Sequence, residues 1–387
     1  MNQASQRGKF LFVLLGVDGG GGGQLTPAFA LIRRLVGRGH EVRAMGPPAL
    51  AQRVRERGAI FVPLRLLPQP VPPAGVMLEE QIGELFAFAC SSMLAKDVLQ
   101  NLEGIDVLAA DCMLPAALFA GELKGIPTVA LVHMPYQWYA EGGGAGLLDG
   151  LVAPFVRQTR FELGLPALLG EAPLMSQLMN SAARSLALTL AEFDSPLKWT
   201  HSNLRYVGPA LDEEAAKWVP PGRPLVLVSF STTYMHHEDA LRRTFAALNG
   251  IDAFAVCTLG YAMSRDRMPV SPNVSIYDWL AHEAILPHAA AVVTHAGHST
   301  VMAALAHGVP LVCMPMGRDQ DTNAERVMAL GAGVTLPPSA APAEISAAIK
   351  NVLANPSYRD VAGRLAVQIR ELGRGEHAVG ELEGLLK

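Results

Sequence analysis

The sequence predicts an α/β protein with two domains, each built on a doubly wound parallel sheet. The chain has 387 residues, which is too long for one ordinary core and fits two domains of just under about two hundred residues each. Short apolar runs of strand length also alternate with helical runs through both halves of the chain. Such alternation is typical of parallel sheets that are covered by helices on both faces.

The elements follow this pattern in order. In the first half, apolar runs predict strands at 10–15, 41–45, 60–64, 107–110 and 128–132, and a helix at 27–38. A stretch rich in proline, glycine and charge, from Pro209 to Pro224, predicts the linker. The strand pattern then restarts at 225–230 and returns at 253–258, 274–276, 291–294, 311–314 and 333–336. We therefore expect an N-terminal domain over 1–212 and a C-terminal domain over 213–365.

Composition excludes several classes of protein. Half of the residues are hydrophobic and 17% are charged, which predicts a well-buried globular protein. The net charge of -4 shows no basic excess, so nucleic acid is not expected as a partner. The four cysteines have no CxxC spacing and are expected to be buried thiols in a reducing cytoplasm. We expect no signal peptide and no stable membrane insertion, because no run reaches the roughly 18 apolar residues of a span.

The most informative segment runs from Thr294 to Val327 and reads THAGHSTVMAALAHGVPLVCMPMGRDQDTNAERV. A short strand ends in a turn of small, hydroxyl and imidazole side chains, and an Ala-rich helix follows. A helix N-terminus offers unpaired N–H groups and partial positive charge, which suit a phosphate. A second strand delivers Asp319 and Gln320 at its carboxyl end, where ligands of α/β sheets usually sit and where these side chains suit sugar hydroxyls. The two turns together predict a nucleotide-sugar site.

About 50 residues, from Val274 to Arg326, resemble the donor-binding signature of GT-B glycosyltransferases, in particular the bacterial branch that glycosylates natural products and is related to the UDP-glycosyltransferases. The order of the motifs carries the resemblance: Trp279, the His-x-Gly-x-Ser-Thr turn, Gly308-Val309-Pro310, Asp319-Gln320 and Asn323-Ala324-x-Arg326. The resemblance implies a GT-B fold, in which two Rossmann-like domains face each other across a cleft and the C-terminal helix and tail, 366–387, pack back on the N-terminal domain. It also implies transfer with inversion and without a metal.

The predicted donor-binding residues combine turns rich in N–H groups, hydroxyls and imidazoles with an aromatic ring that suits stacking on uracil or thymine. They are Ser231, Thr232, Trp279, His282, His295, Gly297, His298, Ser299, Thr300, Asp319 and Gln320. The acidic residues around Gln320 are assigned to the sugar, so no metal ion and no cofactor are expected. The nucleotide-diphosphate sugar, with UDP or dTDP, is the expected co-substrate.

The first glycine-rich turn, from Gly16 to Pro27, departs from the family pattern. In the family this turn usually ends Gly-His-x-x-Pro, and the histidine is the general base that deprotonates the acceptor. Counting back from Pro27 places Gln24 at that position, and an amide cannot accept a proton at neutral pH. The carboxylate that usually orients the histidine matches Asp111.

Three explanations stay open for the missing base. Asp111 or Asp18 acts directly as the base; the acceptor needs little help, as an acidic phenol, a carboxylate or a carbon nucleophile would; or a histidine such as His133 or His236 replaces it. We take Asp111, Asp18 and Gln24 as the candidate catalytic residues.

The acceptor side is predicted from apolar side chains in the segments 68–95 and 133–158, which suggest a hydrophobic aglycone or, equally, core packing. The candidate acceptor-binding residues are Met77, Phe86, His133 and Trp138. The predicted function is transfer of a hexose or deoxyhexose to a hydrophobic natural product by a cytoplasmic monomer or homodimer. Two alternatives are a lipid-linked sugar transferase at the membrane surface and a non-catalytic helper that binds sugar nucleotides.

Overall fold

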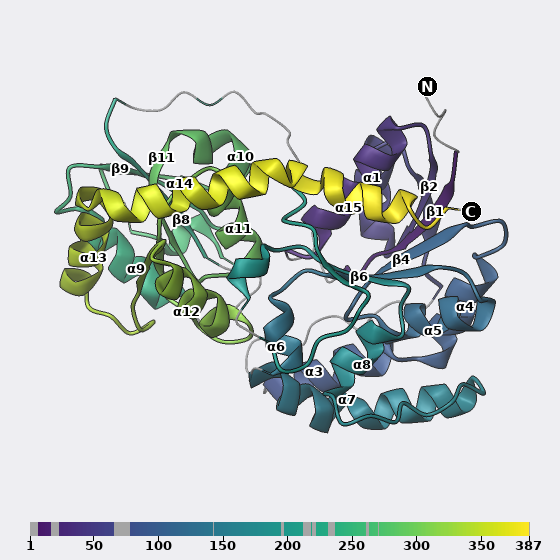
Figure 1. The fold of residues 1–387 in the computed structure, drawn as a ribbon. Coiled ribbons are helices and arrows are strands. Elements are labelled where there is room, and N and C mark those ends of the chain that lie inside the picture. Colours follow the sequence, from purple (N-terminus) through teal and green to yellow (C-terminus); the bar gives the residue numbers. More distant parts are fainter. Residues whose placement is uncertain are drawn as a thin grey trace. The chain divides into compact units, whose positions relative to one another are not determined.

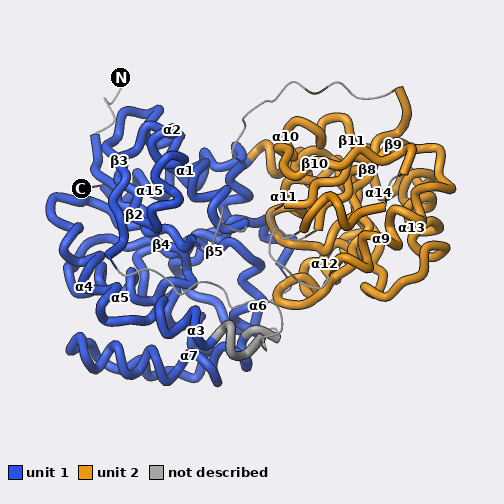
Figure 2. Tube along the Cα trace, turned by 180° about the vertical axis from the view of Figure 1, so that it is seen from behind, with its two compact units in different colours: residues 1–212, 372–387 blue, residues 213–371 orange. Residues whose placement is uncertain are grey.

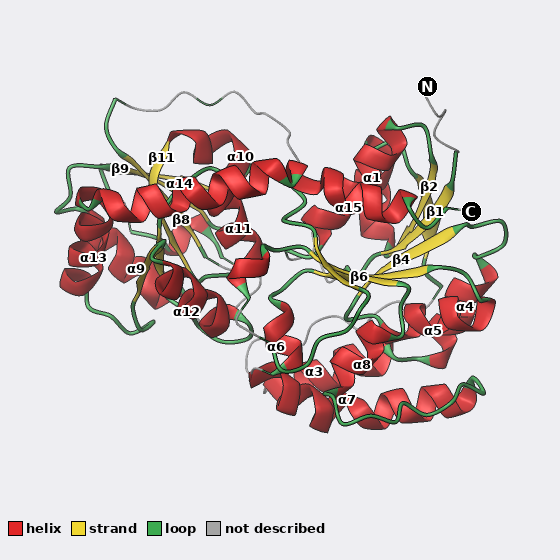
Figure 3. Cartoon of the chain, viewed as in Figure 1, coloured by secondary structure: helices red, strands yellow, loops and turns green. Residues whose placement is uncertain are grey.

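The computed structural model describes residues 7–16, 23–65, 78–141, 143–194, 197–211, 218, 222–230, 237–260, 263–269 and 271–386. The chain divides into two compact units, which are residues 1–212 with 372–387, and residues 213–371 (Figure 2). Each unit contains one parallel sheet with helices packed around it (Figure 3). The prediction of two doubly wound α/β domains is therefore confirmed.

The first unit contains a seven-stranded parallel sheet with the order β3-β2-β1-β4-β5-β6-β7. Its strands are β1 (Lys9–Val13), β2 (Glu41–Gly46), β3 (Ile60–Pro63), β4 (Val107–Asp111), β5 (Thr128–Val132), β6 (Arg184–Ala187) and β7 (Leu204–Tyr206). The order reverses where β1 pairs with β4. The carboxyl ends of the strands at such a reversal are the usual place for a ligand in an open α/β sheet.

Helices cover both faces of this sheet (Figure 1). They are α1 (Leu25–Gly37), α2 (Ala51–Glu56), α3 (Leu78–Ala89), α4 (Ser92–Gln100), α5 (Pro115–Lys124), α6 (Tyr136–Ala140), α7 (Gly143–Glu162), α8 (Leu174–Asn180) and α15 (Glu376–Glu383). Alternate strand residues enter two separate cores, because successive side chains of a strand point to opposite faces. Leu108 and Ala110 pack with the cluster that includes α4 to α8, whereas Val107 and Ala109 pack with α1 and α15.

The second unit contains a six-stranded parallel sheet with the order β10-β9-β8-β11-β12-β13. Its strands are β8 (Leu225–Ser229), β9 (Phe254–Thr258), β10 (Val274–Tyr277), β11 (Ala289–Thr294), β12 (Leu311–Cys313) and β13 (Gly333–Thr335). The helices are α9 (Glu238–Leu248), α10 (His282–Ile285), α11 (His298–Ala306), α12 (Gln320–Leu330), α13 (Pro342–Ala354) and α14 (Pro356–Glu371). Here the order reverses where β8 pairs with β11.

The end of the chain returns to the first unit at Leu372 rather than at residue 366. The reason is that α14 belongs to the second unit, where Leu365 and Ile369 are fully buried and the helix contacts α11 and α13. Residues 366–371, which the prediction placed in the C-terminal segment, therefore belong to the second unit as the end of α14. Of the C-terminal residues, those after α14, including α15, belong to the first unit.

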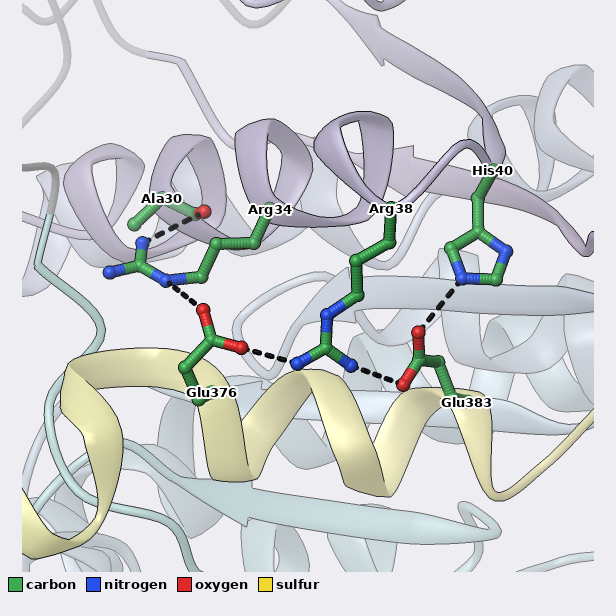
Figure 4. A network of polar contacts seen from close by, with 6 residues as sticks. All are labelled: Ala30, Arg34, Arg38, His40, Glu376 and Glu383. Carbon is green, nitrogen blue, oxygen red and sulfur yellow. Dashed lines mark hydrogen bonds and ion pairs between the residues drawn. The ribbon is translucent and has the colours of Figure 1, made fainter. Parts of the chain in front are cut away.

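A network of charged groups holds α15 against α1 (Figure 4). The Arg34 Nε donates to Glu376 at 3.1 Å, and Arg38 bridges Glu376 and Glu383. The His40 Nε2 lies 2.9 Å from Glu383. Because the backbone N–H of Gly8 donates to the other ring nitrogen of His40, the hydrogen of the neutral imidazole is available for Glu383.

Among the helices that the structure describes, none combines the length and the apolar character needed to cross a membrane.

Candidate active site

Both predicted ligand turns of the second unit contain strained backbone. The turn between β11 and α11 holds Ala296 at φ 66°, and the turn between β12 and α12 holds Arg318 at φ 59°. Within the described ranges, only one other non-glycine residue, Arg374, has a positive φ. Such conformations cost of the order of 1–3 kcal/mol and cluster at ligand-binding and catalytic sites. The strain therefore marks the two turns that the sequence assigns to the donor.

Gly297 is required by a close approach rather than by its backbone conformation. Its φ of -61° is ordinary, but a Cβ added there would lie 2.5 Å from Nε2 of His295 and 2.8 Å from Cε1. The imidazole of His295 is thus folded directly against the N-terminus of α11. A larger residue at this position would displace the ring.

The fully buried amide of Asn323, on α12, joins the two turns. Its Nδ2 donates to the Ala296 carbonyl at 2.9 Å and to Asp319 Oδ2 at 2.7 Å, and its Oδ1 lies 3.2 Å from His298 Nδ1. The sequence predicted Asn323 only as a member of the donor motif and assigned it no role of its own. Its spacing of four residues from Asp319, which places both side chains on one helix face, was the available signal.

Two histidines of the donor region, the half-buried His282 and the buried His295, are neutral. Burial lowers the pKa of His282 to about 4, and its Nε2 lies 3.1 Å from the Ser229 hydroxyl, which also accepts a hydrogen bond from Thr258 at 3.1 Å. Burial, and secondarily the charge of His237, lower the pKa of His295 to about 3. At neutral pH these imidazoles offer hydrogen bonds to a ligand rather than positive charge.

The other predicted donor residues range from buried to exposed. Asp319 and Gln320 are buried at the start of α12, and the Gln320 amide oxygen accepts the Met316 N–H at 2.8 Å. Ser299 and Thr300 are half-buried in the first turn of α11. Trp279 is 61% exposed. The predicted residues Ser231 and Thr232 lie outside the described residues.

In the first unit, Asp111 and His133 form a close pair at the carboxyl edge of the sheet. Asp111 ends β4 and His133 follows β5, and the two strands pair in parallel with Asp111 opposite Leu131. The Asp111 Oδ1 accepts the Met113 N–H at 2.8 Å, and its Oδ2 lies 2.9 Å from His133 Nδ1. Burial by itself lowers the pKa of His133, but the charge of Asp111, helped by Cys112, outweighs it and raises this pKa well above its usual range.

The pair opens into a small cavity that Gln24 also lines. The remaining lining is apolar and comes from β1, α1 and the ends of two further strands: Val13, Leu14, Leu15, Leu25, Ala28, Leu131 and Leu188. The Gln24 amide donates to the Leu15 carbonyl at 3.4 Å. The structure thus brings Gln24, Asp111 and His133 together at the reversal of the strand order. Asp18 and His236 lie outside the described residues.

One group of side chains in the described part of the chain has the composition of a metal site. Single ligand atoms of Asp111, Cys112 and His133 lie within 4.8 Å of one another. The Cys112 thiol is fully buried, donates to the Tyr139 hydroxyl at 3.3 Å, and has a pKa raised by that burial. Deprotonation of this thiol, which a metal would require, is therefore costly.

The predicted acceptor residues differ in where they lie. Phe86 is fully buried and Trp138 is 8% exposed, and both belong to the core of the first unit. Core packing accounts for both side chains without an acceptor, and their acceptor role stays a prediction. Met77 lies outside the described residues, and His133 lines the cavity.

Comparisons with known proteins agree with this architecture. Residues 242–376 match the family described as erythromycin biosynthesis protein CIII-like, C-terminal domain. The 4'-demethylrebeccamycin synthase of Lentzea aerocolonigenes is 28% identical over 415 residues, which cover 95% of this chain and 97% of that protein. The structure of the kitacinnamycin glycotransferase has a TM-score of 0.80 at 24% identity, with 99% and 100% of the two chains covered. Glycosyltransferase VinC, solved in complex with dTDP, has a TM-score of 0.69 at 20% identity, with 97% and 99% covered.

The fold and these relatives define the chain as a glycosyltransferase of the GT-B fold. Within that class, residues 242–376 match the erythromycin biosynthesis protein CIII-like C-terminal domain family. The relatives include a UDP-glucosyltransferase, a demethyllactenocin mycarosyltransferase and an NDP-glycosyltransferase by name. The resemblance seen in the donor motif is thereby confirmed.

Proposed function

We propose that the chain transfers a hexose or deoxyhexose from a UDP or dTDP sugar to a hydrophobic natural-product aglycone, with inversion at the anomeric carbon and without a metal. The observation that carries this proposal is the buried Asn323 amide, which fixes the two donor turns to each other through Ala296 and Asp319. A buried network of this kind specifies one geometry for both turns. It supports one ligand that spans them, with phosphates at α11 and a sugar at α12.

The N-terminus of α11 supplies the groups that a departing diphosphate needs. A helix N-terminus directs N–H groups and partial positive charge toward a ligand, and the Ser299 and Thr300 hydroxyls stand on the first turn of this helix. These groups, with a neutral His295, stabilise negative charge as the bond between the sugar and the phosphate breaks. Inversion follows if the acceptor attacks the anomeric carbon from the face opposite the diphosphate.

The other donor groups fit the sugar and the base. The Asp319 carboxylate and the Gln320 amide are suited to sugar hydroxyls, and the exposed Trp279 ring is suited to stacking on a pyrimidine. A dTDP complex of the structural neighbour VinC supports a pyrimidine diphosphate as the leaving group. The apolar lining of the cavity around Gln24 supports a hydrophobic acceptor.

A donor-binding experiment with two variants tests this proposal. His295→Ala and Asp319→Ala should each weaken binding of UDP or dTDP sugars in calorimetry by roughly tenfold or more, which is about 1.4 kcal/mol, and should reduce turnover correspondingly. Asp321→Ala is the matched control, because Asp321 is exposed two residues after Asp319 on the same helix. Unchanged donor affinity and turnover in both variants would show that the site is assigned wrongly.

A product screen tests the reaction itself. Mass spectrometry should detect a glycosylated product when the chain is given a panel of sugar nucleotides and aromatic acceptors. A complete lack of turnover, combined with tight nucleotide binding, would favour the non-catalytic helper instead.

A further inference from the structure

The acceptor side of the cavity lacks a proton acceptor at the position where the resemblance places one. Gln24 occupies that position, and its amide is held by the Leu15 carbonyl at the end of β1. Asp111 is a carboxylate, but both of its oxygens are already engaged, one with the Met113 N–H and one with His133. A directly acting Asp111 would have to give up its contact with the imidazole. This leaves His133 as the basic group that lines the cavity together with Gln24.

We propose that His133, at the end of β5, is the general base of the transfer reaction and that Asp111 is its positioning residue. The family pattern instead places the base at the start of α1, where this chain has Gln24. The inference rests on the proposed function and names the group that completes it. The 2.9 Å contact between Asp111 Oδ2 and His133 Nδ1 carries it. The contact is an ion pair without hydrogen-bond geometry at Nδ1. The negative charge beside Nδ1 favours the tautomer with its hydrogen on that nitrogen, which leaves the basic lone pair on Nε2.

The transfer step moves one proton and exchanges one bond at the anomeric carbon for another. The acceptor hydroxyl gives its proton to His133 Nε2 while its oxygen forms the bond to the anomeric carbon. The bond between that carbon and the phosphate oxygen breaks, and the nucleotide diphosphate leaves with the electron pair. The charge that appears on the imidazolium is balanced by Asp111 in a largely apolar cavity, where an unpaired charge would be costly.

The burial of the pair supports the same assignment. The His133 and Asp111 side chains are 12% and 8% exposed, so water screens their interaction poorly. Asp111 raises the pKa of His133, which strengthens it as a base but keeps it protonated until the pH passes that raised value. Turnover of a weakly acidic hydroxyl should therefore rise with pH on a limb that lies above the usual histidine range of about 6.5.

Steady-state kinetics on full-length variants test the proposal. With a weakly acidic hydroxyl acceptor, His133→Gln should lower kcat by roughly 10² to 10⁴-fold, whereas Gln24→Ala should lower it by less than about tenfold. Asp111→Asn should lower kcat by at least about a hundredfold and move the acidic limb of the pH profile to lower pH, because the charge that raises the pKa of His133 is gone. With an acidic phenol that ionises unaided, all three losses should be small.

Controls distinguish the loss of a base from a folding defect and from a failure of the proposed function. His201→Gln replaces another half-buried histidine of the first unit and should keep near wild-type turnover. Donor-nucleotide affinity, which belongs to the second unit, should be unchanged in every first-unit variant. If the wild type is active and His133→Gln keeps a near wild-type kcat with the weakly acidic acceptor, the base assignment alone is overturned. If the wild type shows no turnover with any acceptor, the proposed function is refuted.

A chelation experiment addresses the third ligand of the group, Cys112. Activity that survives EDTA treatment and dialysis agrees with a metal-free base. If chelation abolished activity and Zn²⁺ restored it, Asp111, Cys112 and His133 would be metal ligands, and the proposal would be overturned. An NMR titration gives a readout without turnover: the His133 ring should titrate above the usual range in the wild type and lower in Asp111→Asn.

Discussion

Removal of the Asn323 amide should damage the donor site and the second unit together. Asn323→Ala deletes the hydrogen bonds to the Ala296 carbonyl at 2.9 Å and to Asp319 Oδ2 at 2.7 Å, and it also deletes the oxygen that faces His298. The alanine cannot replace any of these contacts, and the fully buried position gives water little access to the partners left behind. The two turns then lose their shared anchor.

The expected magnitude follows from the number of buried partners. Each buried polar group left unsatisfied costs about 1–3 kcal/mol, so the loss of two donated bonds should lower the free energy of unfolding of the second unit by about 2–6 kcal/mol. Displacement of the α11 turn and Asp319 should also weaken nucleotide-sugar binding by at least about tenfold, or about 1.4 kcal/mol. Because Asn323 acts by positioning the two donor turns, KM for the donor should rise more than kcat falls.

Urea unfolding and calorimetry with UDP and dTDP measure the two effects separately. Asn351→Ala is the matched control, because Asn351 lies on a helix of the same unit and makes only an exposed 3.3 Å contact with Tyr358. Asn323→Asp adds a test of geometry: it keeps the shape but places a second carboxylate beside Asp319, so it should bind the donor as poorly as alanine. Wild-type donor affinity in either Asn323 variant would refute the role of this amide.

Two further predictions concern stability. Burial lowers the pKa values of His282 and His295 to about 4 and about 3, so both side chains take up protons more readily in the unfolded chain. The stability of the second unit is therefore highest above a pH of about 6.5, and it is lost as the pH falls toward the pKa values of the folded state. Urea unfolding followed by Trp fluorescence should show the second unit losing up to about 3 kcal/mol per histidine between pH 7 and pH 4, and a His282→Gln variant with the same slope would contradict this. Arg38→Ala should cost about 1 kcal/mol or less in unfolding free energy, because Arg38 is 37% exposed where it bridges Glu376 and Glu383. This loss should shrink in high salt, and a salt-independent loss would point to packing instead.

Strands that follow continuous apolar runs could be predicted from the sequence, whereas two short strands at one edge of the first sheet could not. The strands β4 and β5 are buried at every position and follow continuous apolar runs, so their periodicity is unambiguous. The strands β6 and β7 read RSLA and LRY and gave no such signal. The tail was placed by resemblance, which did not show that α14 has a continuous buried face directed at α11.

The candidate site shows the same limit. The sequence singled out Asp111 and His133 separately, but they are 22 positions apart in the sequence, and only the parallel register of β4 and β5 brings them together. Gln24 could be recognised as a departure because a motif fixes its position. The role of Asn323 depends on the path of the turn at Ala296, which a residue pattern does not describe.

His133 of the first unit and the donor-region histidines His282 and His295 of the second have pKa values shifted in opposite directions, and the difference matches the chemistry proposed for them. Burial without a carboxylate partner keeps His282 and His295 neutral, which suits groups that hydrogen-bond a diphosphate and must not trap it by charge. His133 is buried too, but the carboxylate of Asp111 at 2.9 Å reverses the effect of burial and raises its proton affinity. A group that must take a proton from a hydroxyl needs that affinity, and a group that only donates to phosphates does not. The presence or absence of one neighbouring carboxylate is therefore the feature that separates the proposed base from the donor-binding imidazoles.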